Sequence, residues 1–145
     1  PFVKQLTYNV MDTAADRGEI RTILNRKCRF PFFEPAKFGK KGFYRTEQEA
    51  LAAEGKKYNY KRANTYKALN KLIQGSAADQ TKKAMVDLYE QDGIIPHIQV
   101  HDELNISVEN EEEALNIKHK MENCVDLNLP SVVDHALADN WGDAK

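Results

Sequence analysis

The stretch that decides the fold of this chain runs from Ile98 to Val108 and reads Ile-Gln-Val-His-Asp-Glu-Leu-Asn-Ile-Ser-Val. Apolar residues occupy even positions on both sides of its centre, at 98, 100, 104, 106 and 108, and polar residues separate them. A period of two is typical of strands with one buried face. The sequence therefore predicts two short strands that follow one another closely.

His101, Asp102 and Glu103 lie where one apolar run gives way to the next, so we expect them at the bend of a tight β-hairpin. The usual two-residue turns, Asn-Gly and Asp-Gly, are absent from this bend. Two adjacent acids repel each other, and a cation would relieve that repulsion. Most Asp-Glu pairs in turns are simply solvated, however. A functional interpretation also needs stiff flanking strands and a cationic surface for a phosphate substrate.

Composition indicates one ordinary soluble domain of 145 residues, of which 41% are apolar and 30% charged. We expect neither a membrane span nor a signal peptide, because no apolar run approaches the required length. Cys28 and Cys124 lack metal-ligand spacing and are expected to stay reduced in a cytosol. Because the chain starts at Pro1 without an initiator Met, we expect it to be a piece of a longer protein.

The net charge of −1 conceals an uneven distribution of charge. Residues 1–67 hold 15 Lys or Arg against 7 Asp or Glu, a balance of +8, whereas residues 68–145 hold 6 against 15, a balance of −9. The basic half, with aromatic residues interleaved between Phe30 and Tyr66, suits a polyanionic partner. The acidic half suits cations. For Lys37–Lys61, a merely solvated lysine-rich loop is an equally good interpretation.

The remaining sequence alternates between helical periods and short strand-like runs. The first half predicts a helix over 2–17 ended by Gly18, strands at 19–24 and 27–30, and a basic loop over 32–57 with a helical turn or two at 47–54. A long helix over 59–90 should follow and lead into the hairpin. After the hairpin, the sequence predicts a helix that follows the capping box Asn110–Glu113 and a last strand at 131–138. The predicted fold class is α+β, with long helices packed against a small antiparallel sheet. Its parts would be residues 1–58 and 59–145.

The long predicted helix carries a polar line, Tyr66, Asn70 and Gln74, at i, i+4 and i+8 beside its apolar stripe. On its own, such a line favours an exposed helix face. Gly75 follows as the first of four small residues. A glycine inside a helix costs about 1 kcal/mol, and we interpret it as a place where another backbone approaches closely.

These motifs, in this order, resemble the C-terminal part of family A DNA polymerases, of a bacteriophage type, over essentially the full chain. Val100-His-Asp-Glu103 resembles the palm motif that carries one catalytic aspartate. Ala68–Asp79 resembles the palm helix that follows the fingers, and Glu19–Arg26 resembles the β-turn segment between them. Asp139-Asn-Trp141 resembles the usual chain end. A four-residue motif alone is a weak signal, but several in the right order and spacing are strong.

The resemblance implies a catalytic role for the hairpin tip. Nucleotidyl transfer in this family uses two Mg²⁺ ions, and Asp102 would be a metal ligand. Glu103 would be an auxiliary carboxylate of the same site. His101 would touch the primer terminus rather than a metal.

DNA contacts are implied as well. Asn70 and Gln74 would donate hydrogen bonds to the acceptors that the minor groove presents in every sequence. Where the family commonly has an arginine four residues before the asparagine, this chain has Tyr66, so Arg62 or Lys67 is the candidate for that contact. Basic side chains would lie near the phosphates of the DNA: Arg26, Arg62 and Lys67.

The expected partners are a DNA primer-template and, in the complete enzyme, a dNTP, in a bacterial or phage-infected cytoplasm. The family's other catalytic aspartate and its fingers helix match no stretch of this sequence. The chain would therefore need the remaining polymerase segments, namely the upstream palm strand, the fingers and the thumb. We expect it to have no polymerase activity by itself.

Two other hypotheses stay open. A metal-dependent nuclease would use His97 and His101 with the two acids of the hairpin. Against it, histidines four apart on a strand share a face but lie too far apart for one ion. A non-enzymatic hypothesis makes the chain the DNA-binding half of a split polymerase, which acts only with a partner.

Overall fold

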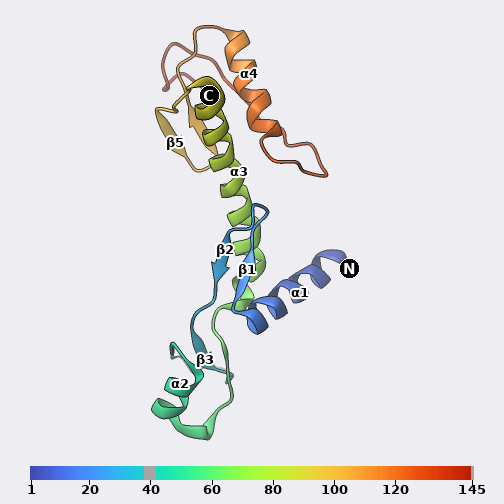
Figure 1. Cartoon of the computed structure of the whole chain (residues 1–145), viewed down its shortest axis with the longest axis vertical. Coiled ribbons are helices and arrows are strands. Elements are labelled where there is room, and N and C mark those ends of the chain that lie inside the picture. Colours follow the sequence, from blue (N-terminus) through green and yellow to red (C-terminus); the bar gives the residue numbers. More distant parts are fainter. Residues whose placement is uncertain (38–41, 145) are drawn as a thin grey trace. The chain divides into compact units, whose positions relative to one another are not determined.

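A computed structural model of the chain describes residues 1–37 and 42–144 (Figure 1). The chain divides into two compact units, Pro1–Ser76 and Ala77–Lys145. Their boundary lies inside the helix α3 (Ala68–Asp92), and the strand at residues 60–62 pairs within the first unit. That the chain forms a single polymerase palm segment stays a prediction.

The described residues of the first unit form two helices, the start of α3 and two pairs of short strands. Its elements before α3 are, in order, α1 (Phe2–Arg17), β1 (Glu19–Arg21), β2 (Lys27–Arg29), β3 (Phe33–Pro35), α2 (Glu47–Glu54), η1 (Gly55–Lys57), β4 (Tyr60–Arg62) and η2 (Thr65–Lys67). β1 pairs with β2 and β3 with β4, both antiparallel. The predicted first helix, the two strands after it and the helical turns at 47–54 are confirmed.

The core of this unit forms where α1, the β1–β2 hairpin and the start of α3 meet. α1 ends at Gly18, whose φ of 68° favours glycine and whose N–H bonds the carbonyl of Ala14 at 3.1 Å. This left-handed residue turns the chain directly into β1. The buried apolar side chains of the core are Val10, Ala14, Ile20, Phe30 and Ala68.

The long helix begins at Ala68, so the predicted start near Asn59 is wrong. Residues 60–62 form β4, in which Arg62 lies opposite Phe33 of β3. Asn64 then adopts a left-handed φ of 62°, which no helix of L-residues accommodates. β3 lies within residues 32–57, for which the sequence predicts a basic loop, so this part of the prediction is wrong. Strand pairing thus overrides the local helical period here.

The second unit contains the rest of α3, β5 (Ile98–Val100), β6 (Glu103–Asn105) and α4 (Glu111–Asn123). α4 begins at the predicted capping box: the Oδ1 atom of Asn110 accepts from the Glu113 N–H at 3.0 Å, and Glu113 accepts from the N–H of Glu109 at 2.7 Å. Buried apolar residues of α3 and α4 include Ala84, Leu88, Ala114 and Ile117. The predicted hairpin and the helix after it are confirmed.

Residues 131–138 form no strand, so the predicted last strand is wrong. A strand requires a hydrogen-bonded neighbour, and this segment is paired with none among the described residues. Its Val133 N–H donates to the Glu122 carboxylate at 2.9 Å instead, and Ser131 accepts from Gln80 at 2.7 Å. The fold class remains α+β, with three two-stranded sheets in the described residues. None of the described helices is long and apolar enough to cross a bilayer.

Candidate catalytic hairpin and DNA-contacting helix face

The acidic tip of β5–β6 is a hairpin with a two-residue turn. Val100 pairs with Glu103, which leaves His101 and Asp102 as the turn and makes Glu103 the first residue of β6. Among the residues that the structure describes, His101 has a positive φ of 53° and Asp102 does not. A positive φ in a two-residue hairpin turn is usually taken by glycine, asparagine or aspartate. A histidine in that position stores local strain, as residues at functional sites often do.

The register of the hairpin separates the apolar residues of its two strands. Ile98 lies opposite Asn105, and Gln99 lies opposite Leu104. Because directly opposed residues share a face, the apolar side chains of β5 and Leu104 of β6 lie on opposite faces. Ile98 and Val100 are 41% and 39% exposed. The prediction that one face of the first strand is buried is therefore wrong. A sheet of only two strands does not bury the apolar side chains of β5.

The turn presents the Asp102 carboxylate to solvent. Within the described residues this carboxylate forms no hydrogen bond and no ion pair, and the residue is exposed. Glu103 is exposed too, and its Oε1 atom accepts from the amide of Asn105 at 3.1 Å. The Gln99 amide donates to the carbonyl of His101 and braces the turn. The tip thus offers one unpaired carboxylate on a short, hydrogen-bonded support.

No group of three or more His, Cys, Asp or Glu side chains is arranged to hold a metal ion in the described part of the chain. His97 instead lies with its Nε2 atom 3.0 Å from the hydroxyl of Ser107. The nuclease hypothesis, which needs His97 and His101 to join the two acids at one ion, therefore has no ligand cluster to rest on.

Asn70 and Gln74 are both exposed, one turn apart on α3 within the first unit. Gln74 directly precedes the place where the β1–β2 turn touches the helix. There, the hydroxyl of Ser76 accepts from the Ile23 N–H at 3.1 Å. The hairpin contact fixes the stretch of helix that carries both amides.

Gly75 allows this contact to be close. A Cβ atom on Gly75 would lie 2.9 Å from the Cγ2 atom of Thr22, nearer than such atoms pack. Arg26 donates from Nη2 to the carbonyl of Gly75 at 2.8 Å. The β1–β2 hairpin therefore approaches Gly75 closely, but the nearest atoms belong to the side chains of Thr22 and Arg26, so the predicted approach of another backbone is not what the glycine accommodates.

The basic residues proposed for DNA phosphates differ in what they already bind. Arg62 donates from Nε to the carbonyl of Ala15 and from Nη1 to that of Phe30, at 3.1 Å each. It joins α1 and the residue that follows β2 to β4, a structural role that the sequence does not predict. Lys67 is exposed, with its ammonium 5.5 Å from the ring centre of Tyr66, which is 65% exposed. Lys67 is thus the more accessible cation of the two.

Part of the positive charge of the β1–β2 hairpin is already neutralised by Glu19. Its carboxylate lies 3.2 Å from Arg21 and 3.3 Å from Lys27. Desolvation alone would raise the pKa of Glu19, but the hydrogen bond and charge of Lys27, with the charge of Arg21, bring that pKa below its ordinary value. Two cations near Arg26 are therefore partly occupied within the fold.

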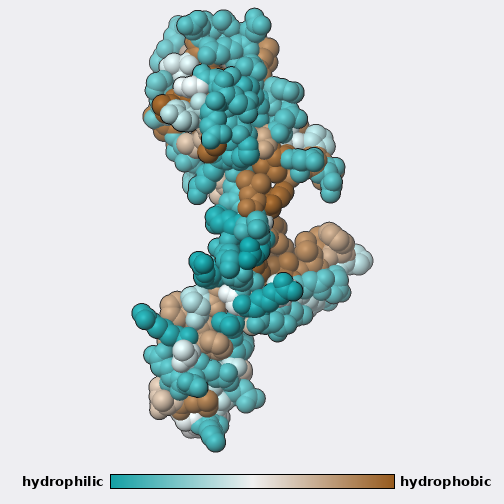
Figure 2. Space-filling model, in the orientation of Figure 1, coloured by the Kyte–Doolittle hydropathy of each residue, from teal (hydrophilic) through white to brown (hydrophobic). Residues whose placement is uncertain are grey.

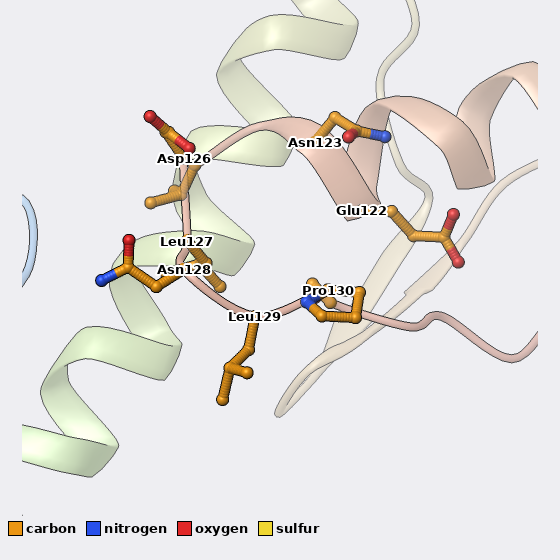
Figure 3. Close-up of a pocket in the computed structure, with 9 residues that line it drawn as sticks. Glu122, Asn123, Asp126, Leu127, Asn128, Leu129 and Pro130 are labelled. Carbon is orange, nitrogen blue, oxygen red and sulfur yellow. The ribbon is translucent and has the colours of Figure 1, made fainter.

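A pocket of about 400 Å³ lies where α4 gives way to the following loop (Figure 3). Glu122 and Asn123 line it from the helix end, and residues 125–131 line it from the loop. None of the predicted site residues belongs to it. Leu129 is 77% exposed beside it, so the pocket is an open surface hollow rather than the candidate site.

Comparison with known proteins identifies the family. The chain matches the model of DNA polymerase family A over residues 1–143. The DNA-directed DNA polymerase of Pseudomonas phage M6 is 39% identical over 142 residues, which are 98% of this chain and 18% of that protein. DNA polymerase I of Geobacillus stearothermophilus is 33% identical over 153 aligned residues, 100% of this chain and 15% of that protein.

A solved structure of a polymerase domain also resembles this chain. The POL domain of Pol1 from M. smegmatis, in complex with DNA primer-template and dNTP, matches with a TM-score of 0.66 at 29% identity, over 98% of this chain and 23% of that one. The chain spans less than a fifth of the length of the two curated relatives. From the family match and these identities, the chain belongs to DNA polymerase family A.

Proposed function

We propose that this chain is part of a DNA-directed DNA polymerase that extends a primer along a template with deoxynucleoside triphosphates. The observation that supports this best is the unpaired Asp102 carboxylate at the tip of a braced hairpin, in a chain that matches the family over residues 1–143. The relatives are named as DNA polymerases, and the solved neighbour holds primer-template and dNTP.

Asp102 is the proposed metal ligand of this hairpin. Its exposed carboxylate supplies the hard oxygen donors that Mg²⁺ prefers, so the donor chemistry fits. The chemistry that two bound Mg²⁺ ions supply in such transfers is positive charge at the attacking and leaving oxygens. One carboxylate does not make that site, so further ligands must come from other segments. Glu103, already hydrogen bonded to Asn105, serves as an auxiliary carboxylate.

The exposed face of α3 is the proposed minor-groove contact. Asn70 and Gln74 present side-chain amides one turn apart, and an amide N–H can donate to purine N3 or pyrimidine O2 in any base pair. The contact of Ser76 with the β1–β2 hairpin keeps this stretch of helix in place. Such donors sense the shape of a base pair without reading its identity.

The remaining contacts follow from charge and position. Lys67, Arg26 and Arg62 are the proposed phosphate contacts, of which Lys67 has the most accessible charge. His101, in the turn beside Asp102, is the proposed contact to the primer terminus. The remaining polymerase segments supply the second catalytic aspartate and the dNTP-binding fingers.

A chimera tests the proposal. In the phage M6 polymerase, this chain replaces the matching segment, to which it is 39% identical. We expect the chimera to extend a labelled primer in Mg²⁺, and we expect the isolated 145-residue chain to extend none. Extension by the isolated chain would contradict the need for other segments. A folded chimera that binds primer-template without extending it would instead support the non-catalytic, DNA-binding hypothesis.

A further inference from the structure

We propose that one face of the β3–β4 sheet is a platform for single-stranded DNA, on which bases stack against Phe32 and Phe43. The inference rests on the proposed function, because a copying polymerase handles single-stranded template ahead of the primer. The platform consists of these two rings and two cations: Lys61, which lies opposite Glu34, two residues from Phe32, and Arg45, two residues along the chain from Phe43.

The two rings form an exposed aromatic pair. Phe32 is 42% exposed and Phe43 is 61% exposed. Their centroids lie 6.4 Å apart with the ring planes at 62°, an edge-to-face contact. A single exposed aromatic residue is ordinary, but two that touch each other present a preformed surface for a planar ligand. Hydrophobic residues reach the surface in this part of the molecule, where Figure 1 labels β3 and α2 (Figure 2).

Backbone hydrogen bonds fix the rings from behind. The Phe33 N–H donates to the carbonyl of Tyr44 at 2.8 Å, and the Tyr44 N–H donates to that of Phe33 at 3.0 Å. The Ala63 N–H donates to the carbonyl of Phe32 at 2.8 Å. Because side chains alternate along extended chain, Phe33 and Tyr44 point to one side of this sheet, and Phe32 and Phe43 point to the other.

The opposite side of the sheet is already occupied. Tyr44 and Tyr60 meet there edge to face at 6.4 Å. Tyr44 donates its hydroxyl to Glu54 at 2.8 Å, and this hydrogen bond raises the pKa of Tyr44 above its ordinary value. The guanidinium of Arg62 lies 4.8 Å from the ring centre of Phe33. The side chains on that side of the sheet are therefore already in contact with other residues, whereas the rings of Phe32 and Phe43 contact mainly each other.

Charge and ring geometry together favour single-stranded DNA. Arg45 is exposed, and within the described residues its guanidinium pairs with no carboxylate. Lys61 meets Glu34 only at 3.8 Å, and its side chain is 59% exposed. Aromatic rings beside cations are the pattern of non-specific single-strand binding, in which bases stack and phosphates meet Lys or Arg. A duplex offers these rings no free base face, because its bases stack on one another.

The test measures binding of a 5′-fluorescein-labelled (dT)₂₀ oligonucleotide to the 145-residue chain by fluorescence anisotropy, at 50 and 200 mM salt. The variants are Phe43→Ala, Phe43→Leu and Phe43→Trp. The matched control is Phe2→Ala, which removes another exposed phenylalanine, 76% exposed on α1 of the same unit. Circular dichroism melting confirms that each variant is folded.

We expect Phe43→Ala to weaken binding at least about fivefold, the loss of one base–aromatic stacking contact. Phe43→Leu should lose as much, because it keeps an apolar side chain but removes the aromatic face. Phe43→Trp and Phe2→Ala should bind within about twofold of the parent chain, and affinity should fall at higher salt.

Three results would overturn the proposal: no binding of (dT)₂₀ by the parent chain, unchanged binding by Phe43→Leu, or an equal loss in Phe2→Ala. Unchanged binding by Phe43→Leu would point to an apolar protein contact instead. Primer extension by the chimera reports separately on the proposed function. If the chimera extends primers but the 145-residue chain does not bind (dT)₂₀, only the proposed platform is wrong. If the chain binds (dT)₂₀ through Phe43 but the chimera does not extend primers, only the proposed polymerase function is wrong.

Discussion

Gly75→Ala adds a methyl group where α3 meets the β1–β2 hairpin. In an ordinary helix interior this change stabilises a protein by about 1 kcal/mol. Here the new Cβ atom would lie 2.9 Å from Thr22 Cγ2 and 3.2 Å from Arg26 Nη2. Overpacking typically costs about 1–3 kcal/mol, and a displaced hairpin weakens two hydrogen bonds worth about 1 kcal/mol each. We expect Gly75→Ala to lower the free energy of unfolding by about 1–3 kcal/mol.

Thr22→Ser supplies the matched partner variant. It removes the Cγ2 methyl group that collides with the new Cβ atom, and it keeps the hydroxyl, which accepts from the Arg26 N–H at 3.1 Å. Since Thr22 is 5% exposed, the single change should cost about 1 kcal/mol for the lost buried methyl group. The double variant should recover at least about 1 kcal/mol relative to the sum of the single changes.

Urea and thermal denaturation of the 145-residue chain, followed by circular dichroism, measure this cycle. Each kcal/mol corresponds to roughly 2–4 °C in Tm for a chain of this size. A Gly75→Ala chain that melts at a higher temperature than its parent would refute the close contact. Additivity of the two changes within about 0.5 kcal/mol would refute the coupling between Gly75 and Thr22.

Two further predictions concern the amide-bearing helix face and the basic hairpin. In the chimera, Gln74→Ala should raise extension from a mismatched primer end more than it weakens DNA binding, as measured with matched and mismatched primers. The exposed control Gln48→Ala should change neither quantity. Unchanged fidelity in Gln74→Ala would contradict the proposed minor-groove contact of this side chain. Because the pKa of Glu19 is below its ordinary value in the folded chain, its ionised form contributes stability at neutral pH that is lost as pH falls below about 5. Glu19→Gln should therefore show a flatter dependence of Tm on pH over that range, and curves that stay parallel would contradict the ion pairs with Arg21 and Lys27.

Local signals in the sequence predicted the elements that local contacts define. Gly18 ends α1 because a left-handed residue is needed there, and Asn110 begins α4 through its own side chain. The start of α3 was missed because residues 60–62 pair with β3, whose position in the chain gives no sign in that window. The strand predicted at 131–138 does not form, because a local run of residues does not supply a neighbour to pair with.

In the candidate site, too, local features were predictable from the sequence and long-range contacts were not. The turn at His101 and Asp102 and the close approach at Gly75 follow from short motifs, and both were predictable. The hydrogen bonds of Arg62 were not, because their acceptors lie 47 and 32 residues away in sequence. The spacing of the apolar residues also did not predict the register of the hairpin, in which Ile98 and Leu104 lie on opposite faces of the two-stranded sheet.

Single-turnover primer extension by the chimera, with the Asp102→Asn variant beside its parent, tests the role of the hairpin most directly. Its matched control is Asp134→Asn, which changes another exposed aspartate of the second unit. We expect Asp102→Asn to slow extension at least about 1,000-fold, since loss of a metal-binding carboxylate removes several kcal/mol of transition-state stabilisation. Primer-template affinity should stay within about twofold, and Asp134→Asn should extend like the parent. An Asp102→Asn chimera that extends primers at the parental rate would show that this carboxylate is not catalytic.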